Sequence, residues 1–196
     1  MKNVLFSCLC ILAATLFLAV VPTDAEGAVY DDTVRLHILA NSDTDEDQAL
    51  KLALRDAVLA EFGESLSKNN SAIQAKADLQ LRLDEIESFC REEITRLGYA
   101  YDVSVALSEE WYDTREYDGF TLPRGVYTSL RIIIGEGGGK NWWCVMFPPL
   151  CLDIACESAP YDDAVGGYSG EEIRLISGGG YNVKFKLLEL ISGAFS

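Results

Sequence analysis

Two residue types in this chain could support nucleophilic chemistry: a single histidine and a small set of cysteines. His37 is the only histidine of the 196 residues, and four of the six cysteines follow it, at Cys90, Cys144, Cys151 and Cys156. A thiol beside an imidazole base can attack a carbonyl carbon. His37 would be that base for Cys144, Cys151 or Cys156, so a secreted thiol hydrolase is the enzymatic alternative for this chain. On a predicted strand, a histidine equally fits a structural role.

The same cysteines could instead be oxidised or simply buried. Cys144 and Cys151 bracket the run VMFPPL, in which a turn at Pro148-Pro149 could bring the two residues together. A bridge requires Cα atoms within about 7 Å of each other. Cys144–Cys151 is therefore the candidate disulfide, with free buried thiols as the alternative. Because the chain has no paired CxxC spacing and only one imidazole, we expect no metal site.

Other patterns resemble ligand-binding motifs but fail on spacing. Gly135 and Gly139 enclose three residues where a phosphate loop needs four, and Asn141 stands where that loop needs Ser or Thr. The acidic run from Asp43 to Asp47 lacks the sixth-position Gly and the twelfth-position Glu of a calcium loop. Its carboxylates fit a helix start, where the positive end of the helix dipole stabilises them. We expect neither a cofactor nor a small-molecule substrate.

The most unusual segment is residues 141–152, which combines two Trp, a Phe, a Met and two Pro. Successive residues of a strand face opposite ways, so Trp142 and Trp143 cannot both enter one core. One tryptophan should therefore meet a second layer, a covering loop or a partner protein. Aromatic residues and Met are enriched at the centres of protein interfaces. Burial of both rings, by helices on one side and by the 109–123 loop on the other, is the alternative.

The elements that must position these residues begin with a strand and two helices. Residues 33–40 are rich in apolar and β-branched side chains and predict a strand. A helix is expected from Thr44 to Phe62, stopped by Gly63. A second helix is expected from 71 to 97, because one apolar stripe recurs at helical spacing. That stripe consists of Leu79, Leu83, Ile86, Cys90, Ile94 and Leu97.

Strands dominate the rest of the chain. The expected strands are 101–107, 125–135, 142–147, 172–176 and 183–190. The second and third are expected to form a hairpin, as are the last two, with a helix from Lys186 as the alternative for the final segment. This order favours an α+β fold in which two helices pack on a largely antiparallel or mixed sheet. We predict a single domain over residues 30–196.

The N-terminus and the charge balance bear on localisation and on partners. Lys2 is followed by an apolar run from Val4 to Val21 and a small-residue site at Ala25, the pattern of a signal peptide over residues 1–25. An uncleaved signal anchor is the alternative. The 31 acidic residues outnumber the 16 basic ones, which gives a net charge of −15. That acidity argues against a nucleic-acid partner, which needs a basic face.

Three stretches carry a resemblance to a known family. The first is RLHILANSD at 35–43 with DQALK at 47–51, and the second is LPRGVY at 122–127. The third runs from Gly135 to Cys151 and ends in NWWCVMFPPLC, a composition too unusual for chance agreement. Over most of residues 30–155, the chain resembles the stage II sporulation protein R family.

The resemblance implies signalling in endospore-forming bacteria rather than catalysis. Members of that family are exported from the forespore into the intermembrane space between forespore and mother cell. There they activate a membrane-embedded aspartic-type protease, stage II sporulation protein GA, which processes pro-sigma-E. The implied partner is this sporulation protease as receptor, and no catalytic residues carry over to this chain.

We predict the receptor contacts from the residues themselves. The aromatic and proline-rich group is Trp142, Trp143, Phe147, Pro148 and Pro149. A second group, in the first shared stretch, is Arg35, Asn41 and Asp43. For this second group, helix capping and hydrogen bonds at strand ends are the alternative explanation.

Overall fold

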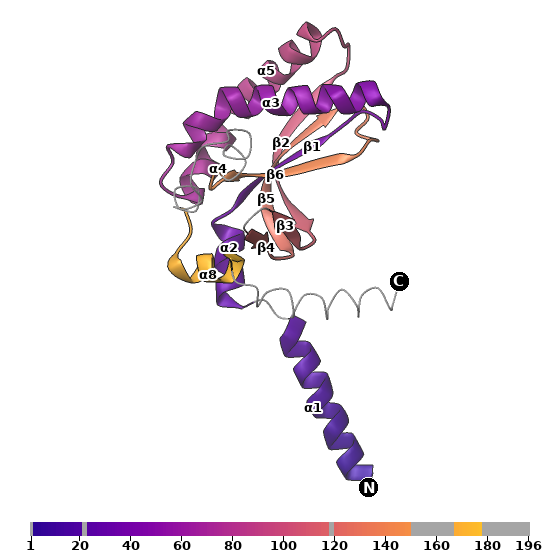
Figure 1. Cartoon of the computed structure of the whole chain (residues 1–196), viewed down its shortest axis with the longest axis vertical. Helices are drawn as coiled ribbons and strands as arrows, with labels where there is room; N and C mark the ends of the chain where they lie inside the picture. Colours follow the sequence, from indigo (N-terminus) through magenta and orange to yellow (C-terminus); the bar gives the residue numbers. More distant parts are fainter. Residues whose placement is uncertain (1, 21–22, 118–119, 150–166, 178–196) are drawn as a thin grey trace.

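A four-stranded sheet lies at the centre of the protein (Figure 1), in a computed structural model that describes residues 2–20, 23–117, 120–149 and 167–177. Its strands, in spatial order, are β2 (Val103–Tyr112), β5 (Gly125–Ile134), β1 (Val34–Leu39) and β6 (Asn141–Phe147). β1 runs parallel to β5 and antiparallel to β6, while β2 is antiparallel to β5. The α+β class with a mixed sheet is therefore confirmed.

β1 is a central strand, and all of its side chains are buried. Its position corrects the predicted hairpin of residues 125–135 and 142–147, because β1 lies between β5 and β6 and pairs with both. The turn that joins β5 to β6 is glycine-rich and bonds to the end of β1. There the Gly139 N–H donates to the Ala40 carbonyl at 2.9 Å. The turn thus crosses over β1 instead of closing a hairpin.

One face of the sheet is covered by helices (Figure 1). They are α3 (Asp45–Ser67), α4 (Ala72–Leu81) and α5 (Leu83–Arg96). The expectation of two helices was wrong, because the helix predicted at 71–97 is broken at Arg82, where φ is −107°. The predicted stop at Gly63 was also wrong. The helix continues past it because Leu66 packs into the core on the same side as Phe62.

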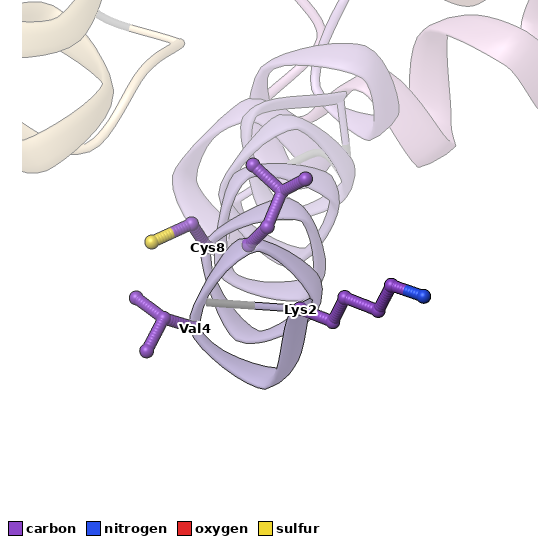
Figure 2. Close-up of a pocket in the computed structure, with 4 residues that line it drawn as sticks. Lys2, Val4 and Cys8 are labelled. Atoms are coloured by element: carbon purple, nitrogen blue, oxygen red, sulfur yellow. The ribbon is translucent and has the colours of Figure 1, made fainter.

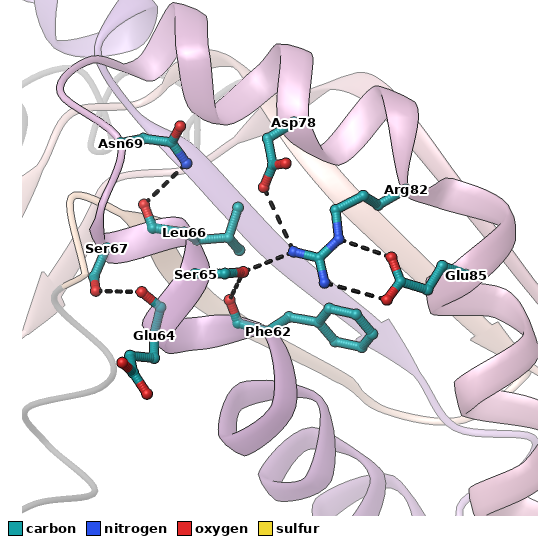
Figure 3. A network of polar contacts seen from close by, with 9 residues as sticks. All are labelled: Phe62, Glu64, Ser65, Leu66, Ser67, Asn69, Asp78, Arg82 and Glu85. Carbon is teal, nitrogen blue, oxygen red and sulfur yellow. Dashed lines mark hydrogen bonds and ion pairs between the residues drawn. The ribbon is translucent and has the colours of Figure 1, made fainter.

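The break at Arg82 is held by a network that joins the end of α3 to the α4–α5 junction (Figure 3). Arg82 donates from Nη1 to Ser65 Oγ at 2.7 Å and from Nε to Glu85 Oε2 at 2.8 Å. Asp78 adds an ion pair at 3.6 Å, and the guanidinium carbon lies 4.8 Å from the Phe62 ring centroid. The hydrogen bond from Arg82 lowers the pKa of Glu85. One side chain therefore ties three helices together.

Short elements lie on the opposite face of the sheet. They are β3 (Arg115–Tyr117), β4 (Phe120–Leu122), α2 (Asp24–Asp31) and α8 (Gly170–Ser177). β3 and β4 form a separate two-stranded sheet, so the prediction of a loop over 109–123 was wrong. Residues 172–176 belong to helix α8 and not to a strand. Their predicted partner strand at 183–190 lies outside the described residues.

α1 (Lys2–Val20) spans most of the predicted signal segment. Figure 2 shows a pocket along this helix, lined by Lys2, Val4, Leu5 and Cys8. All four of these described lining residues come from one helix. Within the described residues, no helix combines the length and the hydropathy that crossing a membrane requires. The predicted cleavage point after Ala25 falls in the first turn of α2, and the signal peptide stays a prediction.

Candidate functional site

The two adjacent tryptophans of β6 point to opposite faces of the sheet, as the strand period predicted. Trp142 faces the helices, and its ring centroid lies 5.0 Å from the guanidinium carbon of Arg55 on α3. Trp143 lies on the other face, with its ring centroid 4.0 Å from the guanidinium carbon of Arg115 on β3. Both rings are half-buried. The helices and the 109–123 segment thus each cover part of one tryptophan, and both rings keep exposed atoms.

His37 lies beside Trp143 in a polar cluster. Its Nδ1 is 2.9 Å from Glu110 Oε2, and its Nε2 is 3.1 Å from Asn141 Oδ1. The imidazole and the Trp143 ring have centroids 5.6 Å apart. Arg131 approaches the same Glu110 carboxylate, at 3.4 Å. Both ring nitrogens of His37 therefore have hydrogen-bond partners, which gives this histidine the structural role that the sequence left open.

Arg35 is completely buried on the same face of the sheet. Its Nη2 donates to the Tyr117 hydroxyl at 2.7 Å, and its guanidinium carbon lies 3.8 Å from the Tyr112 ring centroid. Among the described residues, Nε and Nη1 find no hydrogen-bond partner. Stacking on an aromatic face offsets part of the cost of burying such a charge. Burial also raises the pKa of Tyr112. Arg35 thus sits inside the protein and not on its surface.

Asn41 and Asp43 join two loops at one end of the sheet. Asn41 Oδ1 accepts from the Glu136 N–H at 3.1 Å, and Asp43 Oδ1 accepts from the Lys140 N–H at 2.7 Å. Asn41 also donates to Asp47 Oδ2 at 2.9 Å. These bonds hold the β1–α3 loop against the β5–β6 turn. Both side chains therefore make the hydrogen bonds at helix and strand ends that were their alternative explanation.

The residues that end β6 are mostly enclosed. Phe147 and Pro148 are buried, and Pro149 is half-buried. The peptide bond between Phe147 and Pro148 is cis. A Cβ at Gly167 would overlap the Pro148 ring, so the Gly167 backbone packs closely against that side chain. In this conformation, the predicted contact residues that keep exposed atoms are Trp142, Trp143, Pro149, Asn41 and Asp43.

The cysteines that the structure describes do not pair with His37. Cys144 projects from the opposite face of the sheet to His37 and is disulfide-bonded, so it cannot serve as a thiol nucleophile there. Its predicted partner Cys151 lies outside the described residues, as does Cys156, and the Cys144–Cys151 pairing stays a prediction. Cys90 is buried on α5, and burial raises the pKa of its thiol to about 12. Within the described residues, no group of His, Cys, Asp or Glu could hold a metal ion.

The sheet and the helices α3 to α5 lie in a region shared with known proteins. The family model described as stage II sporulation protein R matches residues 30–156. The chain belongs to this family. It is also 39% identical over 122 residues to the stage II sporulation protein R of Bacillus subtilis (strain 168), and the match covers 62% of this chain and 54% of that protein. The chain thus matches about half the length of this curated relative. No solved structure matches the chain.

Membership of the family confirms the resemblance that three sequence stretches predicted. The matched region contains every described strand and the helices α3 to α5, whereas α8 lies beyond it. The polar cluster of His37 and Arg35 and both tryptophans of β6 therefore belong to the shared part of the chain. The family is named for a sporulation protein and not for an enzyme, which supports a role in sporulation.

Sequence reasoning missed the residues through which the 109–123 segment reaches the sheet. Glu110, Arg115 and Tyr117 bond to, or stack on, side chains of β1 and β6. The period-two alternation that predicted a strand at 101–107 stops at the adjacent Glu109 and Glu110, so no local pattern extends that strand to Tyr112. Glu110, Arg115 and Tyr117 contact residues that lie far away along the chain, so residue spacing does not predict these contacts.

Proposed function

We propose that this chain is an exported signalling protein of endospore formation, which activates a membrane-embedded aspartic-type protease. The protease is stage II sporulation protein GA, and its activation triggers processing of pro-sigma-E. The observation that carries this proposal is membership of the stage II sporulation protein R family across residues 30–156. The 39% identity to a protein of that name supports it. On this proposal the chain is a ligand and not an enzyme.

The geometry around His37 supports a ligand better than a thiol hydrolase. A general base needs a nitrogen that can reach the proton of the nucleophile. Both nitrogens of His37 are instead engaged by Glu110 and Asn141, and Cys144 projects from the other face of the sheet. The cluster orders the sheet and the segment that covers it, as a structural site does.

The proposed site of action is the intermembrane space between forespore and mother cell. Export is supported by the N-terminal segment, because an apolar run after a basic start is typical of a signal peptide. The net charge of −15 supports free diffusion in that space. An acidic protein is not drawn to anionic lipid surfaces, so it can move until it meets a specific receptor.

Activation on this proposal is a shift between two states of the protease. A ligand can produce that shift only if it binds the active arrangement more tightly than the inactive one. Trp142, Trp143 and Pro149 are the contact residues that we propose on β6 and after it, since each is half-buried and keeps exposed atoms. Aromatic side chains supply much of the energy in such contacts.

The experiment follows pro-sigma-E cleavage by immunoblot in a sporulating host. Deleting the gene should stop cleavage, and restoring the full chain should restore it. The chain without residues 1–25 should fail to restore cleavage, because it is not exported. Normal cleavage in the deletion strain would contradict the proposal.

Single tryptophan variants test the contact residues in the same host. Trp142→Ala and Trp143→Ala should each keep the fold, as measured by circular dichroism on the purified chain, and should each reduce cleavage. If both variants unfold to the same extent, the tryptophans are core residues and their assignment as contacts is wrong.

A further inference from the structure

β2 forms one edge of the four-stranded sheet, beside β5. The Gly135 N–H donates to the Asp102 carbonyl at 2.7 Å, which makes Asp102 and Gly135 a hydrogen-bonded pair of this antiparallel ladder. Hydrogen-bonded and non-bonded pairs alternate along such a ladder, so the even-numbered residues of β2 bond to β5. The backbone N–H and C=O groups of Leu107, Glu109 and Trp111 therefore point away from the sheet.

Helix α5 covers only the first half of this edge. The outward N–H of Val105 donates to Glu87 Oε2 on α5, at 3.4 Å. Within the described residues, no hydrogen bond reaches the outward backbone groups of Leu107, Glu109 or Trp111. Residues 107–111 are therefore the open edge of β2. An open strand edge is a template on which another extended chain can pair.

Two exposed apolar side chains lie at the end of the open edge. Trp111 is 64% exposed, and its cross-strand partner Val126 is 46% exposed. Paired residues of neighbouring strands share one face of a sheet, so the two side chains form a single apolar patch. The other exposed large hydrophobic residues that the structure describes lie on helices. Exposed tryptophans are enriched among the residues that dominate protein interfaces.

The charge around the open edge is negative. Glu109 and Asp113 are exposed, and no described basic side chain forms an ion pair with either of them. Glu110, between them, turns to the opposite face and bonds to His37. A strand that fits this edge would therefore carry Lys or Arg near Glu109 and an apolar residue against Trp111.

We propose that the open edge of β2 binds an extended, basic segment of a partner protein as a fifth strand of the sheet. This inference rests on the proposed function, because the partner is the extracytoplasmic part of the activated protease. Backbone hydrogen bonds along residues 107–111 supply affinity, and Glu109 with Trp111 supplies selectivity. The tryptophans of β6 lie at the other edge of the sheet, so mutation separates the two surfaces.

The test first measures binding of the full chain to the detergent-solubilised protease. It then measures pro-sigma-E cleavage when the full chain is added to vesicles that contain the protease and pro-sigma-E. Glu109→Pro removes an outward N–H while the pairing with β5 stays intact, and Trp111→Ala removes the exposed ring. Glu109→Lys reverses the charge. Leu81→Ala is the control for Trp111→Ala, since Leu81 is 86% exposed on α4. Glu61→Lys, on the exposed side of α3, is the control for Glu109→Lys. Circular dichroism establishes that each variant is folded.

We expect each open-edge variant to weaken binding by at least about tenfold. The concentration of the chain that gives half-maximal cleavage should rise by the same factor. The controls should change either quantity by less than about twofold. Amide hydrogen exchange at Leu107, Glu109 and Trp111 should slow when the wild-type chain binds, and this readout decides the matter if a variant does not fold.

Two results overturn the proposal in different ways. If the wild-type chain activates the protease and the folded variants bind as well as it does, the open edge is not the docking surface and the proposed function stands. The same holds if binding leaves those three amides unprotected. If the wild-type chain neither binds nor activates the protease, the proposed function is wrong, and the open-edge proposal falls with it.

Discussion

At the scale of single residues, the face of the sheet that carries His37 is organised around the buried charge of Arg35. Arg35 makes one hydrogen bond, to the Tyr117 hydroxyl, and stacks on Tyr112. Its other two nitrogens, Nε and Nη1, have no hydrogen-bond partner in the part of the chain that the structure describes. Because a buried charge destabilises the protein when it loses a partner, the hydrogen bond that Tyr117 accepts from Arg35 should stabilise the fold more than an ordinary tyrosine hydrogen bond does.

Tyr117→Phe should therefore lower the free energy of unfolding by about 1–3 kcal/mol, since it leaves a buried guanidinium N–H without an acceptor. Tyr99→Phe is the matched control, because the Tyr99 hydroxyl bonds to the Glu46 carbonyl at 3.3 Å on the exposed surface. That change should cost less than about 0.5 kcal/mol. Urea denaturation measures both variants, and equal losses would contradict a special role for the bond to Arg35.

Asp47 gives the protein a pH-dependent stability. Hydrogen bonds from Ser42 and Asn41 hold the pKa of Asp47 below its ordinary value of 3.8. A carboxylate whose pKa is lower in the folded state contributes stability at pH values above its unfolded pKa. That contribution is lost as the pH falls through the folded pKa.

Asp47→Asn should therefore be less stable than the wild type at about pH 7, and the difference should shrink as the pH falls below about 4. Asp45→Asn, at an exposed position in the same first turn of α3, is the control and should change stability little at either pH. Thermal unfolding of both variants at neutral and acidic pH gives the comparison. A difference for Asp47→Asn that is the same at both pH values would count against this account.

At the scale of elements, Arg82 marks the place where one predicted helix becomes two. Arg82→Ala should lower the free energy of unfolding by about 1–2 kcal/mol, because it removes a bond to Ser65 and packing on Phe62. Arg91→Ala is the control, since Arg91 pairs with Glu87 on the exposed side of α5 at 2.7 Å. An exposed pair of this kind contributes less than about 1 kcal/mol. In chemical denaturation, Arg82→Ala should have a lower midpoint than Arg91→Ala. Equal midpoints would contradict the structural role of Arg82.

The sequence predicted an element correctly where that element is determined by a pattern of neighbouring residues. The strand at 33–40 was predicted correctly from its apolar and β-branched side chains, which suit a fully buried strand. The apolar stripe from Leu79 to Leu97 was predicted correctly because its side chains recur at the helical period. The hairpin of 125–135 and 142–147 was wrong because a strand from much earlier in the chain enters between its two halves. No pattern within residues 125–147 predicts that β1 lies between these two strands.

The candidate site follows the same rule. The opposite orientations of Trp142 and Trp143 follow from strand geometry, so the sequence predicted them. The bonds from His37 to Glu110 and from Arg35 to Tyr117 join residues 73 and 82 positions apart. Such contacts exist only once the sheet has formed. The open edge of β2 likewise depends on strand order, which the sequence did not reveal.

At the scale of the whole molecule, the sheet has two unlike edges. β6 carries the paired tryptophans under its covering layers, whereas β2 leaves residues 107–111 open beside an exposed tryptophan. The chain has a net charge of −15, and an acidic protein is not attracted to anionic surfaces. These features fit the role that we propose, a diffusible ligand that binds a protease.

A reconstituted cleavage assay tests directly whether this chain activates the protease. Vesicles containing the protease and pro-sigma-E are prepared with and without the full chain, and the cleaved product is measured over time. We expect background cleavage without the chain and cleavage that rises with the concentration of the chain until it saturates. Vesicles that lack the protease should show no cleavage at any concentration of the chain. Complete cleavage without the chain, or none at saturating chain, would contradict the claim that this protein activates the protease.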